Sequence, residues 1–299
     1  MKYEFDLSVH SLLVQKTFLY VLYICKEMKI LVPYDFNPID RIAVDHALFI
    51  AKLAEAKVEL LHIVEKESNR ADAEHNFSEL MKLMPADSKG IINTKVKVGD
   101  IYKDITREGA EGDFQLLVMG THGEKGLQKL LGSHAIKLIT SSKLPFLVTQ
   151  SKGPAETVKR IVLPVNLTKE SLQIVEFAAN TAKRFDADID ILHEPETDEW
   201  LMKKIKINVA HVNNQLNKAG VKHTVVSLPG KKSFAEEVID YGAQHGADLF
   251  AVAHFTESIL PQFDRFSQEM ITNTLQVPVL ILNATDVGRV KGQYTFIDM

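Results

Sequence analysis

The chain has 299 residues, a length that suggests two compact units of ~150 residues each. Hydrophobic residues make up 45% and charged residues 25%, which excludes the disordered classes and is typical of a folded globular protein. The net charge of -4 and the lack of a block of like charges disfavour non-specific binding to nucleic acid. The single cysteine, Cys25, has no partner for an intramolecular disulfide, so we expect a reducing, cytoplasmic compartment.

The first 27 residues differ from the rest of the chain. Residues 12–24 form an apolar run that is shorter than the ~20 residues needed to span a bilayer as a helix. Acidic residues precede this run, which is the opposite of a secretory signal. The sequence that begins at Met28, MKILVPYDF, resembles a natural protein start. We interpret residues 1–27 as an extension, from an early and non-native start; the alternative is a helix that docks on a membrane surface or a partner.

From Met28 on, short apolar runs alternate with segments of helical spacing. The first half predicts strands at residues 29–35, 58–64, 94–98, 115–120 and 145–150, with helices over 38–54, 100–108 and 135–141. The second half predicts corresponding strands at residues 160–166, 188–194, 248–253 and 278–283. Buried apolar runs of this kind are typical of parallel strands that are covered on both faces.

An internal repeat organises the chain. The segment KILVP at residue 29 recurs as RIVLP at residue 160, and the same offset of 131 residues relates His62 to His193 and Gly99 to Gly230. We therefore predict two doubly wound α/β domains, each with a five-stranded parallel sheet that binds ligands at the carboxyl ends of its strands. The predicted boundaries are an extension at 1–27, domain 1 at 28–150, a linker at 151–158, domain 2 at 159–285 and a tail at 286–299.

The stretch from Met119 to His134 contains the residues most suited to binding a ligand. Gly120 and Gly123 follow a buried strand, and Gly132-Ser133 precedes a helical run. Glycines at such places allow the backbone to approach a ligand, and the amides of a helix start together with a serine hydroxyl suit a phosphate. The stretch is neither a Walker A loop nor the dinucleotide-binding fingerprint, and the alternative is that its glycines only form turns.

These residues resemble the universal stress protein family, whose ATP-binding members carry G-x-x-G, nine further residues and then G-S/T after the fourth strand. Gly120, Gly123, Gly132 and Ser133 match this pattern in order. The first strand ends in VPYD, similar to the family's V-P-x-D, and the second in LHI, similar to L-H-V. The resemblance covers 28–150 and, more faintly, 158–284. It implies the adenine-nucleotide alpha-hydrolase-like, flavodoxin-like sandwich fold.

The resemblance also implies a nucleotide site for ATP, with magnesium. Asp35 and Ile63 would contact the adenine and ribose side, while the glycines and Ser133 would hold ribose and phosphates. The full set of expected nucleotide-binding residues is Pro33, Asp35, Ile63, Met119, Gly120, Gly123, Gly132, Ser133 and His134. This chain departs from the pattern because only eight residues separate Gly123 from Gly132. One missing residue rotates a helix start by ~100°, which would misalign Ser133 unless the loop absorbs it.

The second half lacks this motif. The positions that correspond to Asp35, the three glycines and Ser133 are occupied by Asn166, Ala253, Thr256, Arg265 and Phe266. Side chains at the glycine positions obstruct a backbone phosphate cradle, so we expect a nucleotide site in domain 1 only. Members of the family usually pair through their fifth strands. We therefore expect residues 145–150 and 278–283 to pair within one chain, with a homodimer as a further option.

Other residues invite a functional interpretation, each with a simpler alternative. His62 and His193 suggest metal ligands but are also typical of packed histidines, since no other ligand spacing is present. His122, Lys125 and Lys129 suit a phosphate or a solvated loop. Asp35 as a general base lacks an acid/base partner in the sequence pattern. Trp200, near three lysines, indicates either a partner surface or a packed aromatic.

The sequence thus favours a non-enzymatic, ATP-binding stress-response sensor or adaptor, without nucleic-acid or membrane partners. One alternative is a nucleotide-independent dimerisation or scaffold protein. Another is a slow ATPase or nucleotidyl-transfer enzyme, for which the sequence shows no catalytic base.

Overall fold

A computed structural model describes residues 28–121, 137–255 and 265–284 of the chain. Ten described strands form one twisted sheet in the order β3-β2-β1-β4-β5-β10-β9-β6-β7-β8. Neighbouring strands are parallel except at the centre, where β10 (Val279–Ala284) runs antiparallel to β5 (Phe146–Thr149). The protein is therefore an α/β protein with a large, mostly parallel sheet.

The first half of the sheet is built from residues 28–149. Its elements in chain order are β1 (Lys29–Pro33), α2 (Pro38–Ala54), β2 (Lys57–Val64), α3 (Arg70–Leu83), β3 (Ile92–Val98), α4 (Ile101–Glu111), β4 (Leu116–Gly120), a helical segment at residues 137–141, and β5. Strands β1 to β4 alternate with helices, as the apolar runs predicted.

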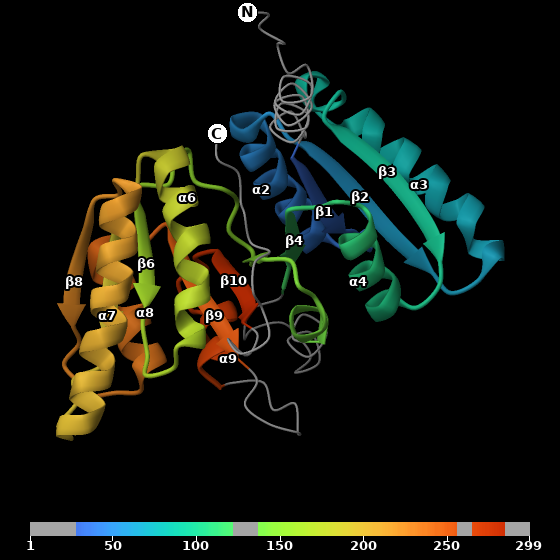
Figure 1. The fold of residues 1–299 in the computed structure, drawn as a ribbon. Coiled ribbons are helices and arrows are strands. Elements are labelled where there is room, and N and C mark those ends of the chain that lie inside the picture. Colours follow the sequence, from blue (N-terminus) through green and yellow to red (C-terminus); the bar gives the residue numbers. More distant parts are fainter. Residues whose placement is uncertain (1–27, 122–136, 256–264, 285–299) are drawn as a thin grey trace, which may run out of the picture.

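The second half repeats this order. Its elements are β6 (Arg160–Pro164), α6 (Val175–Phe185), β7 (Asp188–His193), α7 (Glu199–Ala219), β8 (His223–Ser227), α8 (Phe234–His245), β9 (Leu249–Phe255), α9 (Arg265–Ile271) and β10. Figure 1 shows the two halves side by side, with the sheet passing from one into the other through β5 and β10. We expected two five-stranded sheets with residues 145–150 and 278–283 paired, and in the structure the pairing of β5 with β10 joins the described strands into one sheet.

Helices cover both faces of the sheet because successive strand residues point to opposite faces. In β1, Ile30 and Val32 pack against the face that carries α2, α3, α6 and α7, whereas Leu31 packs against the face that carries α4, α8 and α9. The result is a three-layer sandwich whose two hydrophobic cores each extend through both halves.

Helix α2 begins directly after the residues of the candidate site that follow β1. Asn37 stands at its N-cap position and Pro38 begins the helix, a placement that costs no backbone hydrogen bond. Ala43, Ala47 and Ala51 recur every four residues and are buried against the sheet. The small alanine side chains let α2 lie close to β1 and β4.

The elements that the sequence did not reveal include α3, α7 and β8. Helix α3 has only Ala73 and Phe77 buried, so it lacks a strong apolar period. Helix α7 occupies the segment around Trp200 that resembled a connection, and the side chain of Trp200 is 66% exposed, so the interpretation as a packed aromatic is wrong. The edge strand β8 is mostly half-buried or exposed and therefore carries no apolar run.

Candidate functional site

Three strands bring the described part of the predicted site to one edge of the sheet. The chain order reverses between β1 and β4, and such a switch point is where ligands of parallel sheets bind. Pro33 ends β1 and Asp35 follows it, Ile63 lies near the end of β2, and Met119-Gly120 ends β4. These residues thus lie at the carboxyl ends of neighbouring parallel strands.

Asp35 presents an exposed carboxylate at this edge, with 64% of its side chain accessible. Its backbone amide donates to Oδ2 of Asp40 at 2.7 Å, and the amide of Asn37 donates to the same oxygen at 3.1 Å. The buried Asp40 therefore holds the β1–α2 turn in place from the first turn of α2. This leaves the side chain of Asp35 free to face a ligand.

His62 lies next to Asp35, a pairing that the sequence analysis did not foresee. Nδ1 of His62 lies 2.8 Å from the carbonyl oxygen of Tyr34 and 3.5 Å from Oδ1 of Asp35. Because a carbonyl only accepts, Nδ1 carries a proton and donates this hydrogen bond to the carbonyl oxygen of Tyr34. The imidazole is thus oriented by the backbone, and its separation from Asp35 exceeds hydrogen-bond distance.

An aromatic cluster forms one wall beside Asp35. Phe36 packs its ring 5.2 Å from Tyr34, 4.9 Å from His62 and 5.0 Å from Phe77 of α3, measured between centroids. Phe36 adopts a left-handed conformation with φ of 60°, which is unfavourable for a bulky residue. The ring contacts offset this cost, and burial raises the pKa of the Tyr34 phenol, with a smaller contribution from the Asp40 carboxylate.

The packing of α2 against β4 requires a glycine at position 120, whether or not a ligand binds there. A Cβ atom at this position would lie 2.8 Å from the backbone oxygen of Ile39, at the start of α2. The next residue, Thr121, is buried, and its amide donates to the carbonyl of Thr149 at 2.8 Å. The close approach of α2 to β4 thus accounts for one of the motif glycines without any ligand.

The rest of the predicted site lies outside the described residues. This applies to Gly123, Gly132, Ser133 and His134, and also to His122, Lys125 and Lys129. The described chain reaches residue 121 at the site edge and resumes at residue 137.

The equivalent edge of the second half carries a pocket of about 160 Å³, whose lining includes Asn166, Glu194 and Ile205. Oδ1 of Asn166 accepts from both the amide and the hydroxyl of Thr168, and the Asn166 carbonyl accepts from Nδ2 of Asn208. Phe266, at the position of the motif serine, lies in α9 and stacks on Phe234 at 5.0 Å. Asn166 and Phe266 therefore serve the packing of this half, and Thr256 lies outside the described residues.

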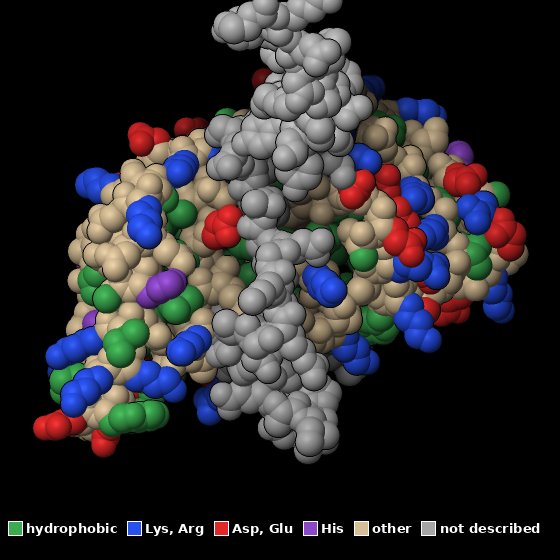
Figure 2. Space-filling model, in the orientation of Figure 1, with side chains coloured by type: hydrophobic (Ala, Val, Ile, Leu, Met, Phe, Trp, Pro, Cys, Tyr) green, Lys and Arg blue, Asp and Glu red, His purple; other side chains and the backbone are tan. Residues whose placement is uncertain are grey.

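Within residues 28–121, 137–255 and 265–284, no group of three or more His, Cys, Asp or Glu side chains is arranged to hold a metal ion. None of the helices in this part of the chain combines the length and the apolar content needed to cross a membrane. On the face seen in Figure 2, lysines and arginines are interspersed with acidic residues rather than gathered into one basic surface.

Comparison with known proteins agrees with this geometry. A family model described as the universal stress protein family matches residues 28–150, the segment that contains the whole predicted site. A search of curated proteins gave no match.

Solved structures resemble the chain over both halves. A universal stress protein from Archaeoglobus fulgidus has a TM-score of 0.67 at 17% identity and covers 86% of this chain and 98% of its own. A putative universal stress protein from Pseudomonas aeruginosa has a TM-score of 0.56 at 16% identity and covers 87% of this chain and 94% of its own. At these identities the likeness shows the fold alone.

Proposed function

We propose that the protein is a stress-response sensor or adaptor that binds ATP, with magnesium, in its first half, where the universal stress protein family model matches residues 28–150. The observation that carries the proposal is the meeting of β1, β2 and β4 at one edge. Their ends bring Asp35, Ile63 and Gly120 together at the point where the glycine motif begins.

The described residues suit the adenine and ribose part of a nucleotide. The exposed carboxylate of Asp35 is an acceptor for ribose hydroxyls, and the half-buried Ile63 offers apolar surface to a base. The glycines and Ser133 of the motif would supply backbone amides and a hydroxyl to the phosphates. The missing residue between Gly123 and Gly132 affects only this phosphate part of the site.

We place the nucleotide in the first half only, and assign a structural role to the second. At the edge of the second half, residues with side chains replace the motif glycines, Asn166 bonds to Thr168 and Asn208, and the pocket measures about 160 Å³. The two halves then act as a pair joined through β5 and β10, in which Val148 lies opposite Val279. This pairing buries apolar strand edges that would otherwise promote aggregation.

The binding site shows no catalytic arrangement among its described residues. Nδ1 of His62 donates to the Tyr34 carbonyl and lies 3.5 Å from Asp35, so the pair does not form the hydrogen bond expected of a base with its orienting carboxylate. Binding without turnover is therefore the function we favour. A sensor of this kind responds to ATP only if one of its conformations binds ATP more tightly than another.

A matched pair of variants tests the assignment to the first half. Asp35 and Asn166 occupy equivalent repeat positions, so Asp35→Ala and Asn166→Ala remove corresponding side chains. We expect calorimetric titration with Mg-ATP to show roughly tenfold weaker binding for Asp35→Ala, because a hydrogen bond to a charged group contributes about 1.5–3 kcal/mol. We expect unchanged affinity for Asn166→Ala. Equal losses in both variants would contradict a site confined to the first half.

Absence of binding would favour the alternative of a nucleotide-independent scaffold, for which the continuous ten-stranded sheet is the supporting feature. ATP turnover by the wild type that is lost in Ser133→Ala would favour a slow ATPase.

A further inference from the structure

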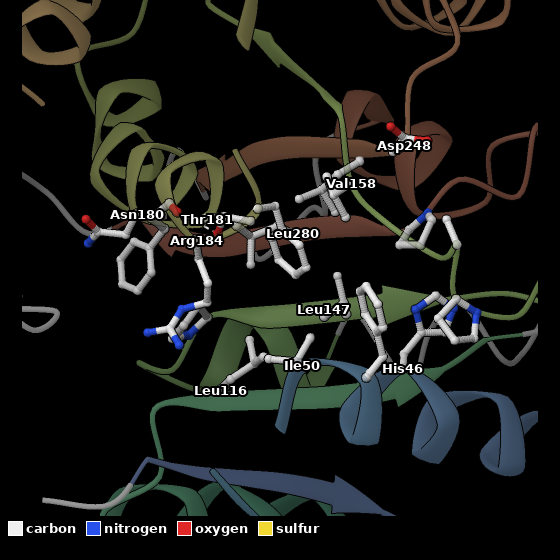
Figure 3. A pocket seen from close by; sticks show the side chains of 18 of the residues that line it. His46, Ile50, Leu116, Leu147, Val158, Asn180, Thr181, Arg184, Asp248 and Leu280 are labelled. Atoms are coloured by element: carbon white, nitrogen blue, oxygen red, sulfur yellow. Dashed lines mark hydrogen bonds between the residues drawn. The ribbon is translucent and has the colours of Figure 1, made fainter. Parts of the chain in front are cut away.

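A cavity of about 470 Å³ lies between the two halves, away from the candidate nucleotide site. Helices α2 and α6 flank it, and Leu116, Leu147 and Leu280 of the central strands line it (Figure 3). Gln115, Pro145 and Pro278 also line it and stand just before β4, β5 and β10, so the cavity reaches toward the starts of these strands. The predicted nucleotide site lies at the opposite ends of β1, β2 and β4.

The walls of the cavity are mainly apolar. Phe49 of α2 stacks on Phe185 of α6, with ring centroids 5.5 Å apart and an angle of 16° between the planes. Ile50 faces the gap from α2, as Figure 3 shows. The volume and the apolar lining are those of sites that bind small organic molecules.

One end of the cavity is polar and includes His46 and Lys152. His46 is 5% exposed, and its Nε2 lies 3.1 Å from the carbonyl oxygen of Lys152 in the segment that joins the halves. Because the carbonyl only accepts, Nε2 carries the proton. Burial lowers the pKa of His46, although the Lys152 carbonyl and the Asp45 carboxylate oppose this shift.

The other end carries an uncompensated positive charge. The side chain of Arg184 extends from α6 into the gap between the halves (Figure 3). No carboxylate among the described residues forms an ion pair with its guanidinium, and Lys183 stands beside it in the lining.

The two acidic residues of the lining are already engaged. Oδ2 of Asp248 accepts from the backbone amides of Lys159 and Arg160 at 2.7 and 3.0 Å. Glu176 also takes part in an interaction with another group of the protein. Among the described residues, the lining therefore offers an apolar body and a cationic end, with no carboxylate paired to Arg184.

We propose that this cavity binds an amphipathic organic anion, with its apolar part on Leu147 and Leu280 and its carboxylate or sulfonate at Arg184. Such a ligand contacts both halves at once and would stabilise their association. The proposal does not depend on nucleotide binding, because it uses other residues at a different place on the sheet.

The test uses the full chain and 1-anilinonaphthalene-8-sulfonate as a fluorescent probe, with decanoate as competitor and decanol as its uncharged analogue. We expect the folded protein to enhance probe fluorescence and decanoate to displace the probe at roughly tenfold lower concentration than decanol, since a charge-assisted hydrogen bond to the anion is worth about 1.5–3 kcal/mol. We expect saturating Mg-ATP to leave the displacement of the probe by decanoate unchanged.

Three variants locate the site. Arg184→Gln removes an exposed cation without disturbing the core, and we expect decanoate to bind about tenfold more weakly while decanol is unaffected. Ile50→Trp fills the cavity from a half-buried position and abolishes displaceable probe binding. Lys206→Gln, on the distant α7, is the matched control and binds as the wild type does.

Absence of probe and decanoate binding to the folded wild type would overturn the proposal. So would undiminished binding by Ile50→Trp, or equal decanoate affinity in Arg184→Gln and wild type.

Discussion

Gly120 ends β4 where the backbone of α2 passes closest to the sheet. The sequence motif singles out this glycine as a ligand contact, and the structure adds a packing reason, because the carbonyl oxygen of Ile39 occupies the space beside it. Gly120 therefore serves both the packing of α2 against β4 and the predicted contact with a ligand. Loss of nucleotide binding in a Gly120 variant would not by itself identify a phosphate contact, which is why Asp35 is the better probe of the site.

Gly120→Ala is expected to destabilise the protein by about 1–3 kcal/mol, because the added methyl group lies 2.8 Å from a backbone atom that cannot rotate away. Gly90→Ala is the control, since a Cβ there meets nothing within 4 Å. Urea unfolding of both variants measures the difference. Equal midpoints for the two variants would contradict the tight approach of α2 to β4.

Burial of His46 makes the free energy of unfolding depend on pH. Burial lowers its pKa in the folded protein below the ordinary value of about 6.5, so the unfolded chain takes up a proton at higher pH than the folded one. Stability therefore falls as the pH drops below about 6.5, until the pH passes the folded-state pKa. We expect wild type to lose more free energy of unfolding between pH 7.5 and 5.5 than His46→Gln does. Parallel losses in urea titrations would show that His46 is not buried as described.

The residues of the site were predictable only in part. Pro33, Asp35, Ile63, Met119 and Gly120 all stand where the strand-end motifs predicted, because such motifs are local in sequence. The contacts among them were not predictable. The approach of His62 to Asp35 depends on the register of β1 against β2, which no local pattern specifies.

The local sequence predicts some helices and strands well and misses others. The central strands are continuous apolar runs because both faces are covered, and α2 begins and ends at the residues that its pattern predicts. Helix α7 was missed because polar and apolar residues alternate at residues 204–209, a pattern that is also typical of a strand. Its N-cap is nevertheless well formed, since Oδ1 of Asp198 accepts from the amides of Trp200 and Leu201.

The exposed start of α7 can be tested by fluorescence, because Trp200 is the one tryptophan of the chain. Its side chain is 66% exposed, and the ammonium of Lys204 lies 5.3 Å from its ring. We expect emission close to that of tryptophan in water, easily quenched by acrylamide, and almost unchanged on unfolding. A strongly blue-shifted emission in the native protein would mean that this face of α7 is covered.

At the scale of the molecule, the pairing of β5 with β10 turns two repeated halves into one sheet with shared cores. The repeat itself was visible in the sequence, since KILVP and RIVLP begin the two halves. The antiparallel junction follows from tertiary packing, and the apolar runs of β5 and β10 do not specify the direction in which they pair.

Because the halves share both cores, we predict that they unfold together. Differential scanning calorimetry is expected to give one transition with equal calorimetric and van't Hoff enthalpies. Val148→Pro, which places a proline in the central strand β5, is expected to remove a hydrogen bond of the sheet and to lower this transition. Two resolved transitions in the wild type would contradict a shared core.

The central claim is that the first half binds ATP at the edge formed by β1, β2 and β4. The most direct test is calorimetric titration of Mg-ATP into wild type and Gly132→Val. We expect wild-type binding in the micromolar range, about -8 kcal/mol, and its loss in Gly132→Val without a loss of fold. The absence of heat and of any thermal shift at millimolar ATP in the wild type would contradict it.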